Sequence, residues 1–399
     1  MAVESPTNEN LATVAVASLQ GKPKRTVAQG NRLPALTGLR GVAVLLVVIQ
    51  HATTAMYGPC SFELRRLTAP FFCCWCGVDL FFVLSGFLLT DILLKQCSSP
   101  HYFRNFYARR CLRIWPLYYG FLALAALVAV ATHSSFHGSQ SGAALVFSAL
   151  FLNNVYQSSH LPCWMTIGAV AVNHLWSLSV EEHFYLGWPL IVKWLKPAIL
   201  LNICFAACVV ICLARILFYA HGGNPFAISV LTPFRIDTIF AGSIVACLWH
   251  LRTDGSKLHE LAKRILVPSS IAFSGLLYAT DFAPAAPILA TYGYSIIACT
   301  FASLLLLLLS GDRNYWLNRL LSRRELAVLG KYSYAIYIFH FPVVYMFAEK
   351  FENSGLLKND ADVVILGMLA PIIVTVGLAI LSWHLLEKPF LKLKPRFSE

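Results

Sequence analysis

A histidine and an arginine share the first long apolar segment, residues 36–57 (LTGLRGVAVLLVVIQHATTAMY). The segment is long enough to cross a bilayer, which takes about 20 mostly apolar residues. At a rise of about 1.5 Å per residue, His51 lies roughly 16 Å along the helix from Arg40, so Arg40 sits at one membrane face and His51 near mid-membrane. An ionisable side chain at that depth indicates a functional site. The alternative is a histidine that only hydrogen-bonds a neighbouring helix.

Two carboxylates interrupt a later apolar segment, where Glu181 and Glu182 follow each other in SLSVEEHFYL. Adjacent residues point about 100° apart on a helix, so at most one of them faces the interior of a bundle. A buried carboxylate needs a cationic or histidine partner. We expect His51 to be that partner, because a carboxylate would fix the tautomer of the imidazole and raise its basicity as a general base.

The sequence YFRNFYARRCLRIWPLYY, residues 102–119, interleaves arginines with aromatic residues. Arg110 and Arg113 are three residues apart and therefore share a helix face. Guanidinium groups on one face suit phosphates or another polyanion, and neighbouring aromatic rings can stack on an adenine. The alternative is ordinary positive charge that contacts lipid headgroups.

Other polar residues also lie inside apolar segments. Asp79 is either the partner of a buried cation or an interfacial acid without a role, and the small residues Ser85 and Gly86 favour close helix approach. His340 follows Lys331 by nine residues, which places it about 13 Å into the membrane. A structural histidine and a histidine that lines a pathway both fit this position.

The composition bounds the class of protein. The chain has 399 residues, of which 58% are hydrophobic and only 13% charged, whereas soluble proteins carry about 25% charged residues. The sequence therefore predicts an all-α, multi-pass membrane protein. The formal charge of +12 does not indicate nucleic acid, because no nucleic-acid-binding motif is present. The twelve cysteines are not spaced as zinc ligands, so we expect no metal site.

Ten apolar segments predict membrane-spanning helices. They cover residues 36–57, 71–94, 112–132, 175–195, 197–220, 228–250, 265–281, 286–310, 332–349 and 362–386. The stretch 142–152 is too short to cross and predicts a re-entrant or interfacial piece. With the N-terminus in the cytoplasm, 25 of the 31 Lys and Arg residues fall on the cytoplasmic side, in accord with the positive-inside rule. We expect a bundle of about ten spans with both termini cytoplasmic.

The motifs together resemble the acyltransferase-3 family. The segments that carry the resemblance are LTGLRGVAVLLVVIQHA, GVDLFFVLSGFLL, YFRNFYARRCLRIWPLYY, LWSLSVEEHFYL, FRIDTIFAG, LGKYSYAIYIFHFPV and LEKPF. Members of this family are membrane O-acyltransferases that modify bacterial surface polysaccharides, peptidoglycan, root-nodulation oligosaccharides and macrolides. The resemblance implies a membrane domain over residues 33–392, flanked by a flexible cytoplasmic tail over 1–32 and a short one over 393–399, in the inner or plasma membrane.

The resemblance also implies roles for individual residues. The family's arginine and histidine, with ten residues between them in the first span, fall on Arg40 and His51. Its cytoplasmic arginine pair falls on Arg110 and Arg113, and the carboxylate of its Ser-Val-Glu motif falls on Glu181.

One position departs from the family's pattern. His183 stands where the family most often has glutamine, and it could alter the acceptor pocket.

These residues imply one mechanism. An acyl-CoA serves as the donor substrate and is not a permanently bound cofactor; its phosphates dock on the three arginines. Its thioester reaches His51, which acts as general base on an acceptor hydroxyl while Glu181 or Asp79 orients it. An acyl-histidine intermediate is the other route.

The resemblance implies that the acyl group is acetyl or another short chain, and that the acceptor is a cell-envelope or exported carbohydrate or a lipid-linked sugar. Membrane lipids surround the chain. The alternatives are a macrolide or other small metabolite as acceptor, or a proton-coupled transporter or flippase in which His51, Glu181 and His340 relay protons. Transporters often contain an internal repeat, and none is evident in this sequence.

Overall fold

The computed structural model describes residues 33–132, 139–160, 165–251, 254–283, 286–311, 315–352, 354 and 356–397. The predicted tail over residues 1–32 lies outside these described residues. The α-helices are α2 (Leu33–Ala55), α3 (Phe62–Thr68), α4 (Gly77–Gln96), α5 (Tyr102–Ala131), α6 (Ser139–Ala149), α7 (Asn153–Ser159), α8 (Trp176–Trp194), α9 (Pro197–Ala220), α10 (Pro225–Val230), α11 (Thr232–His250), α12 (Gly255–Ala279), α13 (Tyr294–Ser310), α14 (Trp316–Leu321), α15 (Arg324–Glu352), α16 (Asp360–Asp362), α17 (Ala370–Ser382) and α18 (Lys388–Leu391).

Short helical turns and one hairpin complete the described chain. The 3-10 and π-helical turns are η2 (Ala69–Cys76), η3 (Asn173–Leu175), η4 (Leu289–Gly293), η5 (Val363–Leu369), η6 (Trp383–Glu387) and η7 (Lys394–Phe397). The strands β1 (Thr166–Ile167) and β2 (Val170–Ala171) pair in an antiparallel hairpin. The predicted all-α class is confirmed, since this hairpin is the only sheet in the described residues.

Seven helical stretches in the described chain are long and apolar enough to cross a membrane, which agrees with a multi-pass membrane protein. They are Pro34–Ala55, Phe62–Gln96, Tyr102–Ala131, Pro197–Ala220, Pro225–His250, Leu289–Ser310 and Asp360–Leu391. The other predicted spans, 175–195, 265–281 and 332–349, coincide with the helices α8, α12 and α15. The count of ten spans stays a prediction.

The stretch 142–152, predicted as re-entrant or interfacial, forms the end of α6 and a tight turn. The turn places Phe151 in the left-handed region with φ of 55°. The Tyr118 ring of α5 stacks on Phe151 with ring centroids 4.4 Å apart, and the Tyr118 hydroxyl donates a hydrogen bond to the Ser148 carbonyl over 2.7 Å. These contacts hold the end of α6 against α5. The α6 helix is 11 residues long, which is too short to cross the bilayer alone.

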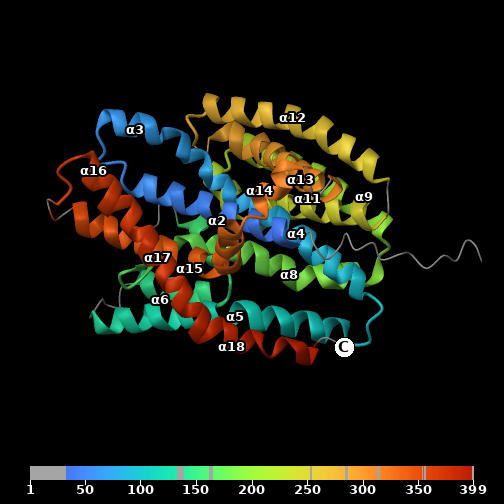
Figure 1. Ribbon diagram of the computed structural model, residues 1–399, viewed down its shortest axis with the longest axis horizontal. Coiled ribbons are helices and arrows are strands. Elements are labelled where there is room, and N and C mark those ends of the chain that lie inside the picture. Colours follow the sequence, from blue (N-terminus) through green and yellow to red (C-terminus); the bar gives the residue numbers. More distant parts are fainter. Residues whose placement is uncertain are drawn as a thin grey trace, which may run out of the picture.

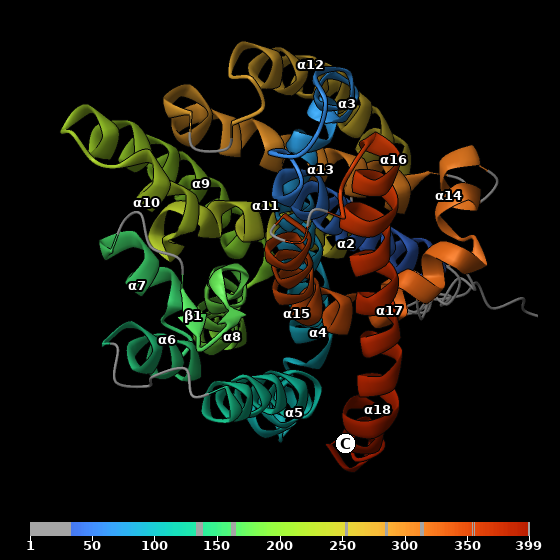
Figure 2. The same ribbon diagram turned by 90° about the vertical axis from the view of Figure 1, so that its left-hand side faces the viewer.

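The helices α2, α4 and α15 occupy the middle of the bundle, with α5, α11, α13 and α17 around them (Figures 1 and 2). Glycines bring α2 and α15 into close contact. A Cβ on Gly330 would lie 1.8 Å from the Thr37 carbonyl oxygen, and one on Gly41 would lie 2.3 Å from that of Leu326. This tight pairing fixes the depth of the α2 side chains relative to those of α15.

The pair α4 and α11 is equally close. A Cβ on Gly86 would lie 1.9 Å from the Ile239 carbonyl oxygen, and one on Gly242 would lie 2.0 Å from that of Val83. The predicted packing role of Gly86 is therefore confirmed. Small residues at such contacts let helix backbones approach in a membrane.

Replacing Gly86 by Val is expected to destabilise the protein by about 1–3 kcal/mol, the usual cost of overpacking, because its added methyl groups would meet the α11 backbone. Thermal unfolding in detergent measures this. The matched control is Gly187→Ala in α8, where nothing lies within 4 Å of the added Cβ, and we expect it to match the wild type. Equal stability of the Gly86 variant would contradict the close contact.

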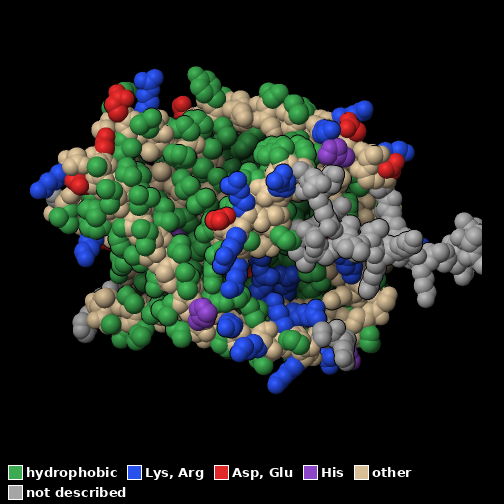
Figure 3. Space-filling model, in the orientation of Figure 1, with side chains coloured by type: hydrophobic (Ala, Val, Ile, Leu, Met, Phe, Trp, Pro, Cys, Tyr) green, Lys and Arg blue, Asp and Glu red, His purple; other side chains and the backbone are tan. Residues whose placement is uncertain are grey.

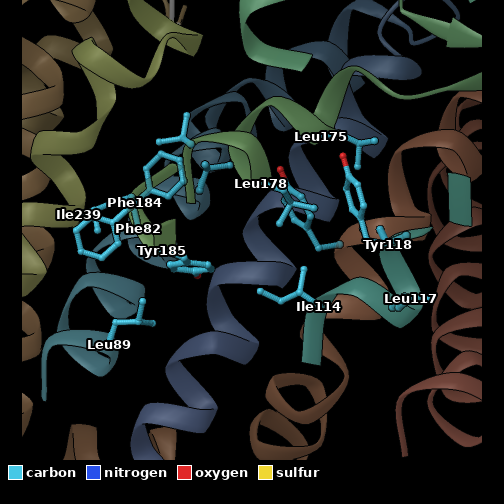
Figure 4. Packing of buried hydrophobic residues seen from close by; sticks show 14 of the residues in the cluster. Phe82, Leu89, Ile114, Leu117, Tyr118, Leu175, Leu178, Phe184, Tyr185 and Ile239 are labelled. Atoms are coloured by element: carbon cyan, nitrogen blue, oxygen red, sulfur yellow. The ribbon is translucent and has the colours of Figure 1, made fainter. Parts of the chain in front are cut away.

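Aromatic and aliphatic side chains from α4, α5, α8 and α11 converge beside α2 (Figure 4). The labelled residues that also border the cavity described next are Phe82, Leu89, Ile114, Leu178 and Tyr185. The centre of the bundle is thus a packed core around a cavity.

Candidate active site

A cavity of about 290 Å³ lies between α2, α4, α5, α8 and α15. Its lining along α4 extends from Val78 to Ile92, about 21 Å at 1.5 Å per residue. Most of the lining is apolar, and its charged side chains are Arg40, Arg110, Arg113 and Glu181. We call the end near Ile92 the basic end and the end near Val78 the histidine end.

The basic end is formed by Arg40 of α2 together with Arg110 and Arg113 of α5, the three arginines expected to bind a donor. The structure brings them together, and Arg113 and Arg110 are among the closest charged neighbours of Arg40. The Arg110 guanidinium lies over the Tyr185 ring, 5.5 Å from its centroid. Three cations around one opening form a site suited to a polyanion.

A second cavity, of about 350 Å³, adjoins the basic end and shares Arg110 and Arg113 with the first. It adds Arg109 of α5 and Lys394 of η7, which packs against α5. Figure 3 shows Lys and Arg side chains gathered around a hollow on this face of the molecule. Burial and the nearby arginines lower the pKa of Lys394 to about 8. The cationic side chains that line this cavity, Arg109, Arg110, Arg113 and Lys394, give it a positive potential.

Glu181 lines the same cavity, but the structure does not pair it with His51. Its Oε1 accepts a hydrogen bond from the Ser85 hydroxyl over 2.7 Å, and its Oε2 accepts one from the Tyr185 hydroxyl over 2.8 Å. The expected contact with His51 is therefore wrong, since Glu181 lies near Arg40, about three helical turns along α2 from His51. Ser85 binds this carboxylate, which goes beyond the packing role predicted from its size.

His51 lies beyond the histidine end of the cavity. Tyr337 and Ser177 line that end. The Tyr337 hydroxyl donates a hydrogen bond to the His174 carbonyl over 2.9 Å and lies 2.5 Å from the Ser177 hydroxyl. One helical turn further along α15, His340 reaches His51, with 3.3 Å between His340 Nε2 and His51 Nδ1.

His174 joins these two histidines to form a cluster drawn from three elements. Its ring centroid lies 5.4 Å from that of His340, and the rings of His51 and His340 lie 5.0 Å apart. His174 sits in η3, just before α8, and sequence reasoning did not single it out. We call His51, His174 and His340 the histidine cluster.

The Asp79 carboxylate is held by an arginine. Its Oδ1 lies 2.7 Å from the Arg235 guanidinium, and both side chains are at most 2% exposed. A second buried pair, Arg215 with Asp237 at 2.8 Å, lies beside it. Of the two roles considered for Asp79, partner of a buried cation is confirmed. In the described residues no contact joins Asp79 to His51, so the structure gives no support to Asp79 as the orienting acid.

Replacing Asp79 by Ala is expected to destabilise the protein by about 3–5 kcal/mol, because Arg235 would be left buried and unpaired. Thermal unfolding in detergent measures this. Asp91→Ala is the matched control: Asp91 pairs with the half-exposed Lys95 on the same helix, and its loss should cost about 1 kcal/mol or less. A variant at Asp79 with wild-type stability but no activity would instead identify a catalytic carboxylate.

His183 lies outside the cavity lining. Its Nδ1 is 2.6 Å from the Thr232 hydroxyl, and the ring is half-buried between α8 and α11. The position of His183 outside this cavity gives no support to a role in an acceptor pocket.

Glu387 is buried near Arg113 and Arg40. It belongs to the LEKPF motif, but the sequence alone did not predict a role for it.

Comparison with known proteins defines the class of the chain. Residues 33–385 match the acyltransferase-3 family, which is described as an acyltransferase domain. The match covers most of the sequence, and the chain belongs to this family. Its domain is an acyltransferase domain with helices that are long and apolar enough to cross a membrane.

Three of the curated relatives are named as O-acetyltransferases. YrhL of Bacillus subtilis (strain 168) is 29% identical over 369 residues, which are 90% of this chain and 54% of YrhL. Peptidoglycan O-acetyltransferase OatA of Listeria monocytogenes is 26% identical over 332 residues, 80% of this chain and 51% of OatA. O-acetyltransferase OatA of Staphylococcus aureus (strain NCTC 8325) is 26% identical over 375 residues, 90% of this chain and 57% of OatA. This chain spans about half the length of these relatives. No solved structure matches it.

Proposed function

We propose that the protein transfers an acetyl or other short acyl group from acyl-CoA to a hydroxyl of a cell-envelope or exported carbohydrate. The observation that carries this proposal is the cavity that is lined by Arg40, Arg110 and Arg113 and also by Tyr337, whose ring lies against His340 of the histidine cluster. An acyl-CoA has an anionic nucleotide end and a long flexible arm that ends in a thioester. A basic mouth followed by a mostly apolar cavity complements this shape and charge distribution.

The carbohydrate acceptor rests on the family and on the relatives that are named as O-acetyltransferases. We place the basic end at the cytoplasmic face of the plasma membrane, where acyl-CoA is available and where the positive-inside rule puts the arginines. The acceptor then enters from the opposite side.

In the proposed reaction, His51 Nε2 takes the proton of the acceptor hydroxyl as its oxygen attacks the thioester carbonyl. The new C–O bond forms, the C–S bond breaks, and the proton on His51 passes to the leaving CoA thiolate. The contact of His51 Nδ1 with the Val47 carbonyl oxygen over 2.9 Å supports this role. A carbonyl only accepts, so Nδ1 carries the hydrogen and Nε2 keeps its lone pair.

Tyr337 stands between the cavity and His51. It lines the cavity, and its ring centroid lies 5.2 Å from that of His340. The acyl group must therefore pass Tyr337 before it reaches His51. The hydrogen bonds of Tyr337 to Ser177 and to the His174 carbonyl hold this side chain in place.

Binding of acetyl-CoA to the detergent-purified protein tests the donor. A ligand that binds the folded state raises the unfolding temperature as its concentration increases. We expect such stabilisation with acetyl-CoA. Its absence at millimolar acetyl-CoA would overturn acyl-CoA as the donor.

Affinity for acetyl-CoA is expected to fall as the pH rises above about 8, where Lys394 loses its proton in the unliganded protein. An anion favours the protonated amine, so binding above this pH takes up a proton and Kd rises by at most about tenfold per pH unit. Titrations of the protein with acetyl-CoA at several pH values between 7 and 9.5 measure this change in Kd. The Lys394→Arg variant keeps its charge and should give a flat profile. The same slope in that variant would exclude Lys394 as the titrating group.

A further inference from the structure

We infer that His340 is a positioning residue for His51: it accepts a hydrogen bond from His51 Nδ1–H and so holds His51 Nε2 toward the reacting hydroxyl. The inference deepens the proposed function and, for its kinetic test, rests on it. His340 is fully buried on α15, whereas His51 is partly exposed on α2.

The hydrogen-bond partners fix the tautomer of each ring. His340 Nδ1 lies 2.6 Å from the Tyr337 carbonyl oxygen, which can only accept, so Nδ1 carries the hydrogen. In the neutral ring Nε2 is then an acceptor, and it lies 3.3 Å from His51 Nδ1. His51 Nδ1–H is thus shared between the Val47 carbonyl and His340 Nε2. With the hydrogen on Nδ1, His51 Nε2 keeps its lone pair and can accept a proton.

The same contact stabilises the charge that forms during the reaction. Once His51 Nε2 has taken a proton, His340 Nε2 is a second acceptor for Nδ1–H beside the Val47 carbonyl, and it stabilises the positive charge of the imidazolium. The carboxylates proposed for this task, Glu181 and Asp79, are held by other groups. His340 therefore takes the place that a carboxylate has in a catalytic triad.

The surroundings of His340 contain few other titratable groups. Those that face it among the described residues are His51 of α2, His174 of η3 and Tyr337 of its own helix. His174 Nε2 is 3.0 Å from the Ile338 carbonyl oxygen, so it carries the hydrogen of that ring. His174 is therefore not a second donor to His340 Nε2.

The kinetic test compares two substitutions at one site. His340→Phe keeps a ring but removes the acceptor, and we expect kcat to fall about 10²-fold, the cost of a displaced catalytic group, with KM for acetyl-CoA unchanged. His340→Gln places an amide oxygen near Nε2 and should restore most of kcat. His221→Phe, a like change at an exposed histidine at the end of α9, should leave kcat unchanged. Equal rates for His340→Phe and the wild type, or a loss that Gln does not rescue, would overturn the inference.

A second readout does not depend on transfer. Diethyl pyrocarbonate acylates the unprotonated imidazole nitrogen, and mass spectrometry of the peptide that contains His51 gives its rate. We expect slower modification of His51 in His340→Phe and recovery in His340→Gln. If His51 is modified more slowly in His340→Phe and recovers in His340→Gln, but the protein transfers no acetyl group, the proposed function is contradicted and the positioning role of His340 is supported. Unchanged modification of His51 in both variants would overturn that role.

Discussion

The variant His51→Gln is expected to lose acyl transfer, with kcat lower by about 10²- to 10⁴-fold, the usual contribution of a general base. The amide cannot take the proton of the acceptor hydroxyl. Binding of acetyl-CoA should persist, because the arginines proposed to bind its phosphates line the cavity, whereas His51 does not. Initial rates and thermal shifts on the same preparation separate the two effects.

The neighbouring residue provides the control. Gln50 hydrogen-bonds Thr54 one turn along the same helix, on an exposed face, so Gln50→Ala should turn over as the wild type does. Turnover within a few-fold of normal in His51→Gln would contradict its assignment as the base.

The double variant Arg110→Ala/Arg113→Ala is expected to weaken acetyl-CoA binding by at least about 10²-fold. Each hydrogen bond to a charged group contributes about 1.5–3 kcal/mol, and both side chains line both cavities at the basic end. The dependence of the unfolding temperature on acetyl-CoA concentration measures the change.

Arg104 is the matched control for this loss. It lies on the same helix and contacts Asn105, but it is exposed and borders neither cavity. Arg104→Ala should bind acetyl-CoA as the wild type does. An equal loss in both proteins would mean that the arginines act only through the net positive charge of this face.

The sequence was informative about single helices. Apolar runs predicted helices at each of the ten segments, and the distances along them placed His51 and His340 at similar depths. The spacing of Arg110 and Arg113 put them on one face, and the structure brings that face to the cavity. These features depend only on the rise and pitch of a helix, which are constant.

Contacts between helices could not be derived in the same way. The order in which the helices pack is set by details such as the reciprocal glycine contacts of α4 and α11. Without that order, His51 was paired with Glu181, whereas its neighbour is His340. The contact of Glu181 with Tyr185 could have been predicted from the sequence, because Tyr185 follows Glu181 by four residues and lies on the same helix face. His174 and Lys394 gave no periodic signal, since they lie just outside long helices.

Transfer of label from radioactive acetyl-CoA tests the central claim most directly. Everted membrane vesicles from cells that produce the wild type or His51→Gln expose the basic end to the added donor. We expect alkali-labile acetyl label on the carbohydrate fraction with the wild type and only background with His51→Gln at equal protein level. Equal labelling by both proteins, or no labelling by the wild type, would contradict transfer from acyl-CoA through His51.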